Sequence, residues 1–392
     1  MAQYSLPAYF MRGGTSKALM VLKSDLPAQQ EHWAPLFCAA MGSPDPYGRQ
    51  LNGMGGGVSS LSKVCIIGPS EQADIDVEYT FAQVAVREQR VDYRGNCGNM
   101  SAAVGPFAVH AGLVKAHTGP TTVRILNTNT NKIIESRFLT EHGQPVYTGD
   151  LSIPGVSGTG APIELRFLEP GGATTGKLLP TGKASEQLVI PGEGTFNVSC
   201  VDAANAAVLV QADEIGLKGT ELPDELERNP AVLRRLELIR QHASVAMGIA
   251  HSIDEASQIK MVPFVCILSA PQDNPTLQKH IIPTAELDLV ARVISNGQPH
   301  RALPLTISLC IAVAAQIQGT VAHHLLTASH TSASSNNKLR LANPSGVLEV
   351  EAEVSAHADH GWHAHYGSFY RTARLLFNGQ VWVPESVWPQ QK

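Results

Sequence analysis

Two stretches of this 392-residue chain are apolar in nearly every direction around a helix axis. The first is residues 99–111 (NMSAAVGPFAVHA) and the second is residues 302–315 (ALPLTISLCIAVAA). A helix that is hydrophobic all round has to be buried on every side. The longest apolar run is about 13 residues, whereas a membrane span needs about 20. We therefore expect two helices buried within protein, and no membrane span.

The rest of the chain predicts an α+β fold made of two similar halves. Each apolar stretch follows a polar, glycine-containing loop, and these loops lie roughly half the chain length apart. The other segments are mostly short, alternating or β-branched runs between tight turns, as in antiparallel sheets. Helices are also expected at 29–41 and 223–247. Each half is then a curled, mostly antiparallel, barrel-like β-sheet around one central buried helix, with the helix N-termini facing a common cleft. A glycine- and threonine-rich stretch predicts the boundary, giving domains 1–185 and 186–392.

Charge and cysteine content exclude several classes of protein. The 29 basic and 34 acidic residues give a net charge of −5, and no basic run suggests a nucleic-acid surface. The six cysteines form no CxxC pair, which argues against a disulfide framework or a thiolate zinc site. The N-terminus has no signal-peptide pattern. We therefore expect a cytoplasmic protein. Its charged fraction of 16% suggests a homodimer, because about 25% is typical.

Cys97 is the cysteine best placed for chemistry, because it ends a polar loop (RGNCG) directly before the first apolar stretch. A thiol at a helix start meets the positive end of the helix dipole, which favours the thiolate. The flanking glycines allow a substrate to approach the backbone closely. The alternative is a small core cysteine, which is our interpretation of the other five.

Lys63 lies between a glycine-rich stretch (NGMGGGVSSLS) and an apolar strand (VCII). Glycine-rich backbone can expose N–H groups as a nest for carboxylates or phosphates. A lysine at the mouth of a buried strand loses hydration, which favours a neutral amine that can act as a base. A lysine that snorkels at the strand end explains the spacing equally well. Arg12, in a second glycine-rich turn (RGGTSK), suits bidentate carboxylate binding, although a plain hairpin is an equal alternative.

Two other patterns resemble a nucleotide-binding motif and a metal site, but we interpret neither as functional. Residues 171–177 (GGATTGK) resemble the start of a P-loop, but Leu178 stands where the magnesium-binding hydroxyl is required. Four histidines crowd into residues 357–365 (HADHGWHAH), with a spacing that suits neither one helix face nor a familiar zinc pattern. We interpret these histidines as part of a hairpin, and we predict no metal and no cofactor.

Five motifs together resemble the PrpF family: MRGGTSK (11–17), GSPDPYGRQLNGMGGG (42–57), SLSKV (60–64), GNCGNMSAAVGPFAV (95–109) and RTAR (371–374). PrpF proteins are 2-methylaconitate cis–trans isomerases of the 2-methylcitrate cycle in propionate catabolism, accessory to an aconitase-like enzyme. The resemblance covers nearly the whole chain and implies the diaminopimelate-epimerase-like fold, in agreement with two similar halves. It also implies a cofactor-independent isomerase of a small tricarboxylate, with an aconitase-like hydratase as functional partner.

The resemblance assigns roles to individual residues. Lys63 would be the proton-transferring base, and Cys97 a second acid/base group across the substrate. Epimerases of this fold use two cysteines, one at each central helix, but QPHR precedes the second helix here. His300 and Arg301 are therefore expected to bind a substrate carboxylate. The other residues expected at the substrate are Arg12, Gly13, Thr15, Ser16, Gly55, Gly56, Ser60, Ser62, Asn96, Gly98 and Asn99.

Related functions remain open alternatives at this point. The same allylic proton transfer would serve a 4-oxalomesaconate tautomerase or an aconitate delta-isomerase. A non-catalytic accessory protein that stabilises an iron–sulfur hydratase is the alternative from another class. The presence of both Lys63 and Cys97 favours an enzyme.

Overall fold

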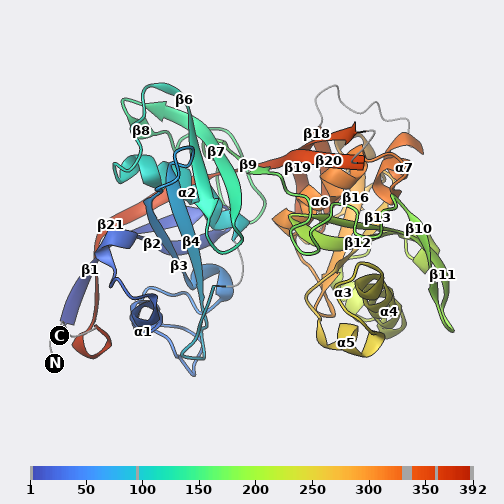
Figure 1. The fold of residues 1–392 in the computed structure, drawn as a ribbon, viewed down its shortest axis with the longest axis horizontal. Coiled ribbons are helices and arrows are strands. Elements are labelled where there is room, and N and C mark those ends of the chain that lie inside the picture. Colours follow the sequence, from blue (N-terminus) through green and yellow to red (C-terminus); the bar gives the residue numbers. More distant parts are fainter. Residues whose placement is uncertain (1–2, 94–96, 329–337, 358–360, 389–392) are drawn as a thin grey trace. The chain divides into compact units, whose positions relative to one another are not determined.

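The computed structural model describes residues 3–93, 97–328, 338–357 and 361–388 (Figure 1). It divides into two compact units. Unit 1 comprises Met1–Arg166 and Tyr370–Lys392, and unit 2 comprises Phe167–Phe369. The predicted boundary at residue 185 lies within unit 2, and the C-terminal strand returns to unit 1, where it pairs with the first strand of the chain. Strands β9 (Ile163–Leu168) and β20 (Gly361–Arg371) carry the chain between the units.

Unit 1 is a mixed, mostly antiparallel sheet with the strand order β21–β1–β2–β3–β4–β6–β7. Along this order the neighbouring pairs are antiparallel, antiparallel, parallel, antiparallel, parallel and antiparallel. The bounds are β1 (Gln3–Gly13), β2 (Ser16–Leu22), β3 (Lys63–Pro69), β4 (Val77–Val84), β5 (Val91–Asp92), β6 (Gly119–Asn127), β7 (Lys132–Glu141), β8 (Gln144–Pro145) and β21 (Ala373–Pro384).

Unit 2 repeats the same scheme in the order β10–β11–β12–β13–β16–β18–β19. Its successive pairs have the same sequence of orientations as those of unit 1. The prediction of two similar halves is confirmed. The bounds are β10 (Glu186–Ile190), β11 (Gly194–Ala203), β12 (Asn205–Gln211), β13 (Phe264–Ser269), β14 (Asn274–Pro275), β15 (Ile281–Ile282), β16 (Leu289–Ser295), β17 (Gln298–Pro299), β18 (Lys338–Asn343) and β19 (Gly346–His357).

Each unit encloses one of the two apolar helices. In unit 1, α2 (Gly98–His110) is buried continuously from Met100 to Val109 and contacts seven of the surrounding strands (Figure 1). In unit 2, α6 (Leu305–Gln316) is buried in the same way against β11, β12, β19 and the short helix α7 (Val321–Ala328). No single helix among the described residues is long and apolar enough to cross a membrane. Only α6 and α7 taken together reach that length and composition, with a bend of 66° between them.

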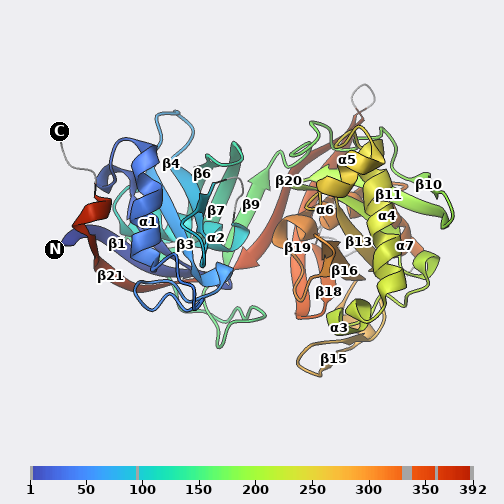
Figure 2. The same cartoon turned by 90° about the horizontal axis from the view of Figure 1, so that it is seen from below.

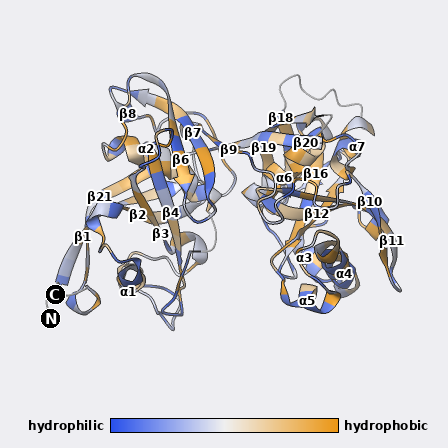
Figure 3. Cartoon of the chain, in the orientation of Figure 1, coloured by the Kyte–Doolittle hydropathy of each residue, from blue (hydrophilic) through white to orange (hydrophobic). Residues whose placement is uncertain are grey.

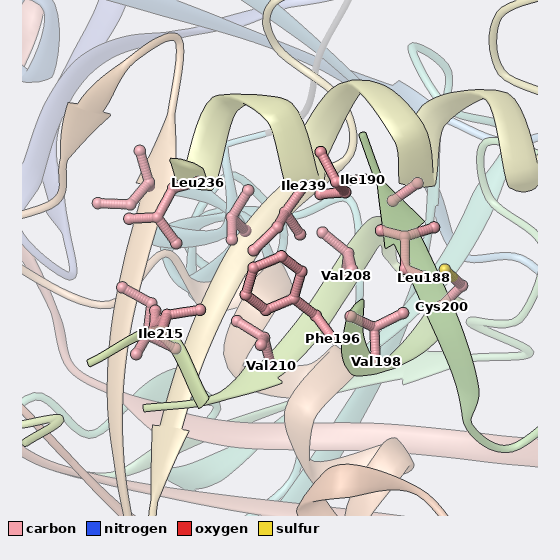
Figure 4. Close-up of a cluster of buried hydrophobic side chains, with 14 of the residues drawn as sticks. Leu188, Ile190, Phe196, Val198, Cys200, Val208, Val210, Ile215, Leu236 and Ile239 are labelled. Carbon is pink, nitrogen blue, oxygen red and sulfur yellow. The ribbon is translucent and has the colours of Figure 1, made fainter. Parts of the chain in front are cut away.

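A second helical layer covers the opposite face of each sheet. In unit 1 it is α1 (Trp33–Met41); in unit 2 it is α3 (Pro223–Glu227), α4 (Pro230–Ala246) and α5 (Ile253–Gln258) (Figure 2). Val208 and Val210 of β12 pack with Leu236 and Ile239 of α4 (Figure 4). The β12 residues that alternate with these two valines therefore point to the other side of the sheet, where α6 lies, since strand side chains alternate. Accordingly, α4 carries both hydrophilic and hydrophobic residues (Figure 3).

Gly105→Ala is expected to destabilise unit 1, although alanine is the better helix former by about 1 kcal/mol. A Cβ at position 105 would lie 2.7 Å from Cβ of Ser136 and 2.8 Å from Cε1 of Phe138. Overpacking of this kind costs about 1–3 kcal/mol, so the melting temperature measured by circular dichroism should fall. In the control, Gly367→Ala, the nearest neighbour is the flexible end of Leu309 at 3.1 Å, and the change should be smaller. An unchanged melting temperature for Gly105→Ala would contradict the packing described for α2.

Candidate active site

Lys63, the first residue of β3, faces the central helix of unit 1. Val64 and Ile66 belong to the core beneath α1. Because strand side chains alternate, Lys63 and Cys65 are turned to the other face of the sheet, where α2 lies. The expectation that Lys63 opens a buried strand is confirmed, since β3 is buried from Lys63 to Gly68.

The Lys63 amine is held by a neutral partner. The side chain is 7% exposed. Its Nζ donates to Oε1 of Gln83 at 2.5 Å and lies 4.9 Å from the centroid of the Phe81 ring. Gln83 is itself fixed, because its Nε2 donates to the backbone oxygens of Ser62 (2.9 Å) and Ser59 (3.1 Å). Gln83 therefore holds the Lys63 amine in place through an uncharged amide.

The β1–β2 hairpin lies directly on the N-terminus of α2. A Cβ on Gly13 would lie 3.0 Å from Cα of Met100, and a Cβ on Gly14 would lie 2.9 Å from Cγ of Asn99. Gly14 also has φ +49°, in the left-handed region. Glycine at both positions therefore permits the close approach. The backbone N–H of Thr15 donates to Oδ1 of Asn99 at 3.4 Å.

Cys97 is the N-cap residue of α2, as its sequence position predicts. Its backbone oxygen accepts hydrogen bonds from the N–H (2.9 Å) and hydroxyl (3.1 Å) of Ser101. Within the described part of the chain, its side chain makes no capping hydrogen bond, and its Sγ lies 4.0 Å from Oγ of Ser16. The thiol is therefore partly exposed at the positive end of the helix dipole.

Lys63 and Cys97 both act on one buried thiol, that of Cys65. Burial is the main cause that raises the pKa of Cys65 above its usual value. The charge of Cys97 raises the pKa further, and the positive charge of Lys63 opposes the shift. Ser16, whose Oγ lies 4.0 Å from Sγ of Cys97, begins β2, and β2 pairs with the strand that Lys63 begins. The roles of Lys63 and Cys97 as base and second acid/base group stay predictions.

Arg12 holds the hairpin in place. Its Nη1 donates to the backbone oxygen of Gly14 (3.0 Å) and to both the backbone oxygen and the hydroxyl of Thr372 (2.9 Å each). Burial and then the neighbouring Arg374 lower the pKa of Arg12. Binding of a substrate carboxylate by Arg12 stays a prediction.

The glycine-rich loop does not form the expected anion nest. Every amide of residues 53–57 donates to an acceptor inside unit 1, those of Gly55 and Gly56 to backbone carbonyl groups. The amides of Gly55 and Gly56 are not free to bind an anion, because the carbonyl groups of Met41 (3.1 Å) and Leu61 (3.2 Å) accept from them. Oε1 of the fully buried Gln50 accepts from the Gly57 amide at 3.0 Å. Contact of Gly55 and Gly56 with a substrate stays a prediction.

Ser62 has a structural role, and its contact with substrate stays a prediction. Its buried hydroxyl accepts from Nε2 of Gln50 at 2.7 Å and donates to the backbone oxygen of Val84 at 2.9 Å, so it ties the loop to β4. Ser60 lies in the turn before β3, and its contact with substrate stays a prediction. Asn96 lies outside the described residues.

His300 and Arg301 lie in unit 2, whereas the other predicted site residues lie in unit 1. His300 shares a 2.7 Å hydrogen bond between its Nε2 and Oγ of Ser295, and burial lowers its pKa. Nη2 of Arg301 donates to Oδ1 of Asp224 at 2.8 Å. Carboxylate binding by this pair stays a prediction.

Unit 2 lacks equivalents of the two reacting groups. Phe264 begins β13 as Lys63 begins β3, and Pro304 precedes α6 as Cys97 precedes α2. Lys63 and Cys97 therefore have counterparts of different chemistry in unit 2, unlike a site built from one cysteine at each central helix.

Sequence reasoning missed Gln83, the hydrogen-bond partner of Lys63. The relevant signal is the antiparallel register, in which Gln83 is directly opposite Lys63. Register between strands cannot be read from the separate segments, so the signal becomes visible only in the folded sheet.

Comparison with known proteins places the chain in a family. The family model described as "PrpF protein" matches residues 3–384. The chain is 38% identical to a 4-oxalomesaconate tautomerase of Pseudomonas putida, over 99% of both chains. It is 36% identical to a 2-methyl-aconitate isomerase of Cupriavidus necator, over 97% of this chain and 98% of the relative.

A crystal structure of methylitaconate-delta-isomerase, 36% identical, matches 100% of this chain and 98% of its own with a TM-score of 0.91. The chain has the fold of that isomerase, and it is itself an isomerase. It belongs to the PrpF family.

Iodoacetamide should modify Cys97 alone among the six cysteines of the native protein. The other five are buried, and burial raises the pKa of each of their thiols. Intact mass should show one adduct per chain, and peptide mapping should place it on Cys97. Cys97→Ser should take up none, and unfolded protein should take up six. Faster modification of any other cysteine in the native chain would contradict the exposure described here.

Proposed function

We propose that this protein isomerises an unsaturated tricarboxylic acid by allylic proton transfer, with Lys63 as the base and Cys97 as the second acid/base group. The substrate proposed first is 2-methylaconitate, exchanged between its cis and trans forms. The observation that carries the proposal is geometric: Lys63 is buried at the start of β3, and Sγ of Cys97 lies 4.0 Å from Oγ of Ser16 at the start of β2, the strand that pairs with β3.

The chemical problem is to remove a proton from carbon. A carbon next to both a double bond and a carboxylate is acidified, because the electron pair left behind spreads over the allyl system and the carboxylate. Lys63 Nζ, as the neutral amine, accepts this proton. The positive end of α2 then stabilises the developing negative charge, because fixed dipoles need no reorganisation during the reaction.

The fate of the proton decides the product. Returned to the far allylic carbon, it gives a positional isomer with the double bond shifted. Returned to the original carbon after rotation within the delocalised anion, it gives cis–trans exchange. Cys97 is the group proposed to deliver or accept the proton opposite Lys63, since its thiol is partly exposed beside the hairpin.

A second candidate substrate is 4-oxalomesaconate, favoured by the 38% identity to the tautomerase of Pseudomonas putida. Aconitate is a third, which uses the same chemistry. A panel of these acids, each followed by NMR with purified protein, separates the candidates by their turnover rates. The aconitase-like hydratase partner, the homodimer and the cytoplasmic location stay predictions of the sequence.

Lys63→Ala should abolish most of the proton transfer. A positioned general base contributes about 10²–10⁴-fold to the rate, so deuterium incorporation and isomer exchange in deuterated water should fall by that factor. NMR with cis- and trans-2-methylaconitate measures both. Lys23→Ala is the matched control, because Lys23 is an exposed lysine paired with Glu78 and should keep the parent rate. Undiminished exchange in Lys63→Ala would remove Lys63 from the mechanism.

Gln83→Glu should move the ascending limb of the pH–rate profile to higher pH. A carboxylate beside Lys63 would favour the ammonium ion, so less neutral amine would be present at a given pH. Rates measured across the pH range should approach the parent rate at the alkaline end. Gln83→Met removes the acceptor without adding charge, and it separates positioning from electrostatics. An unshifted profile in Gln83→Glu would show that Lys63 is not the group whose ionisation limits the rate.

A further inference from the structure

A second cluster of ionisable side chains lies in unit 2, remote in sequence from the proposed reacting groups. Glu169, His363 and His365 place their ligand atoms within 4.8 Å of one another. Nε2 of His363 lies 3.0 Å and 3.3 Å from the two carboxylate oxygens of Glu169. The rings of His363 and His365 meet edge to face, with centroids 4.7 Å apart. The predicted hairpin is confirmed as β19–β20, but the pairing of its histidines with Glu169 was not foreseen.

Irregular backbone brings these side chains together. The register between β19 and β20 shifts between Glu353 and Val354, which makes His365 the extra residue of a β-bulge. Bulges re-aim side chains, and here the bulge accompanies the contact between the two imidazole rings. Glu169 has φ +46°, a left-handed conformation that is rare for a residue with a side chain. Its backbone N–H donates to the His365 carbonyl at 3.0 Å, which fixes it beside the strand.

We propose that Glu169, His363 and His365 form a binding site for a divalent transition-metal ion such as Zn²⁺. Two imidazoles and one carboxylate are a common ligand set for this ion. With metal–ligand distances of about 2.0–2.2 Å, tetrahedral ligands lie about 3.3–3.6 Å apart. The distances of 3.0 Å and 3.3 Å between His363 and Glu169 are only slightly shorter, so the two groups need little movement to share an ion. Water would complete the coordination, since Glu169 and His363 are partly exposed.

The surroundings of His365 fit this role. Its Nε2 lies 2.8 Å from Oγ of Ser355. In the tautomer in which Nε2 donates to Ser355, the lone pair of Nδ1 is available for the ion. Metal-binding histidines are usually oriented by such a hydrogen bond from the second ring nitrogen. The bound ion would fasten β20 to the segment that follows β9, within unit 2.

The test is titration of untagged, metal-stripped protein with ZnCl₂ by isothermal calorimetry. Cys97→Ser serves as the parent, so that the exposed thiol does not compete. We expect one Zn²⁺ per chain, lost in the double variant His363→Ala/His365→Ala. Ser355→Ala should bind about 10–100-fold more weakly. The matched control is His323→Ala/His324→Ala, which removes two adjacent histidines of α7 and should bind as the parent does.

Diffraction data collected at the zinc absorption edge should place one anomalous peak between the three side chains. Glu169→Gln changes an exposed side chain, so it remains informative if the double histidine variant fails to fold, and it should weaken binding. Absence of zinc binding by the parent, or equal binding by Glu169→Gln and the parent, would overturn the proposal and leave a simple histidine–glutamate pair. Isomerase activity is measured separately, so failure of the metal site leaves the proposed reaction untouched.

Discussion

A helix with no polar face is stable in water only when other parts of the chain enclose it completely. Both α2 and α6 impose this requirement, and in each unit the sheet curls around the helix to meet it. Once the sides of α2 are covered, its N-terminus is where the helix dipole can act on a small molecule. The glycines of the β1–β2 hairpin allow close packing there, and Cys97 is left at the helix start beside Ser16. The burial of one helix thus determines where a reacting group is held.

The two units share a strand order, but they differ in the side chains at the two positions proposed for catalysis. At the start of the equivalent strands, unit 1 has Lys63 and unit 2 has Phe264; before the central helices, unit 1 has Cys97 and unit 2 has Pro304. The repeated scaffold is therefore explained by packing, and the site by a few side chains placed on one copy of it. The proposed function therefore rests on those few side chains rather than on the fold itself.

The architecture could be predicted from the sequence because its main signals are local: apolar helices, short strands and glycine turns. The position of Lys63 was also readable, since it stands at the first residue of an apolar run. The domain boundary was not, because it depends on pairing between Gln3 and Pro384, at opposite ends of the chain. The glycine-rich loop shows a different limit. Glycine content indicates backbone freedom, but not that buried Gln50 and nearby carbonyl groups would take up the loop amides. The contacts of Lys63 with Gln83 and of His363 with Glu169 depend on how neighbouring strands align, and this alignment is known only once the sheet has folded.

The pairing of β21 with β1 has a consequence for how the protein is made. Unit 2 is one continuous stretch of chain, Phe167–Phe369, and all of it is synthesised before the last strand. Unit 1 lacks its edge strand until Ala373–Pro384 emerges and aligns with Gln3–Gly13. Unit 2 can thus complete its sheet before unit 1 receives β21. A chain that stopped before Ala373 would leave one edge of β1 unpaired, with β2 as its remaining partner in the sheet.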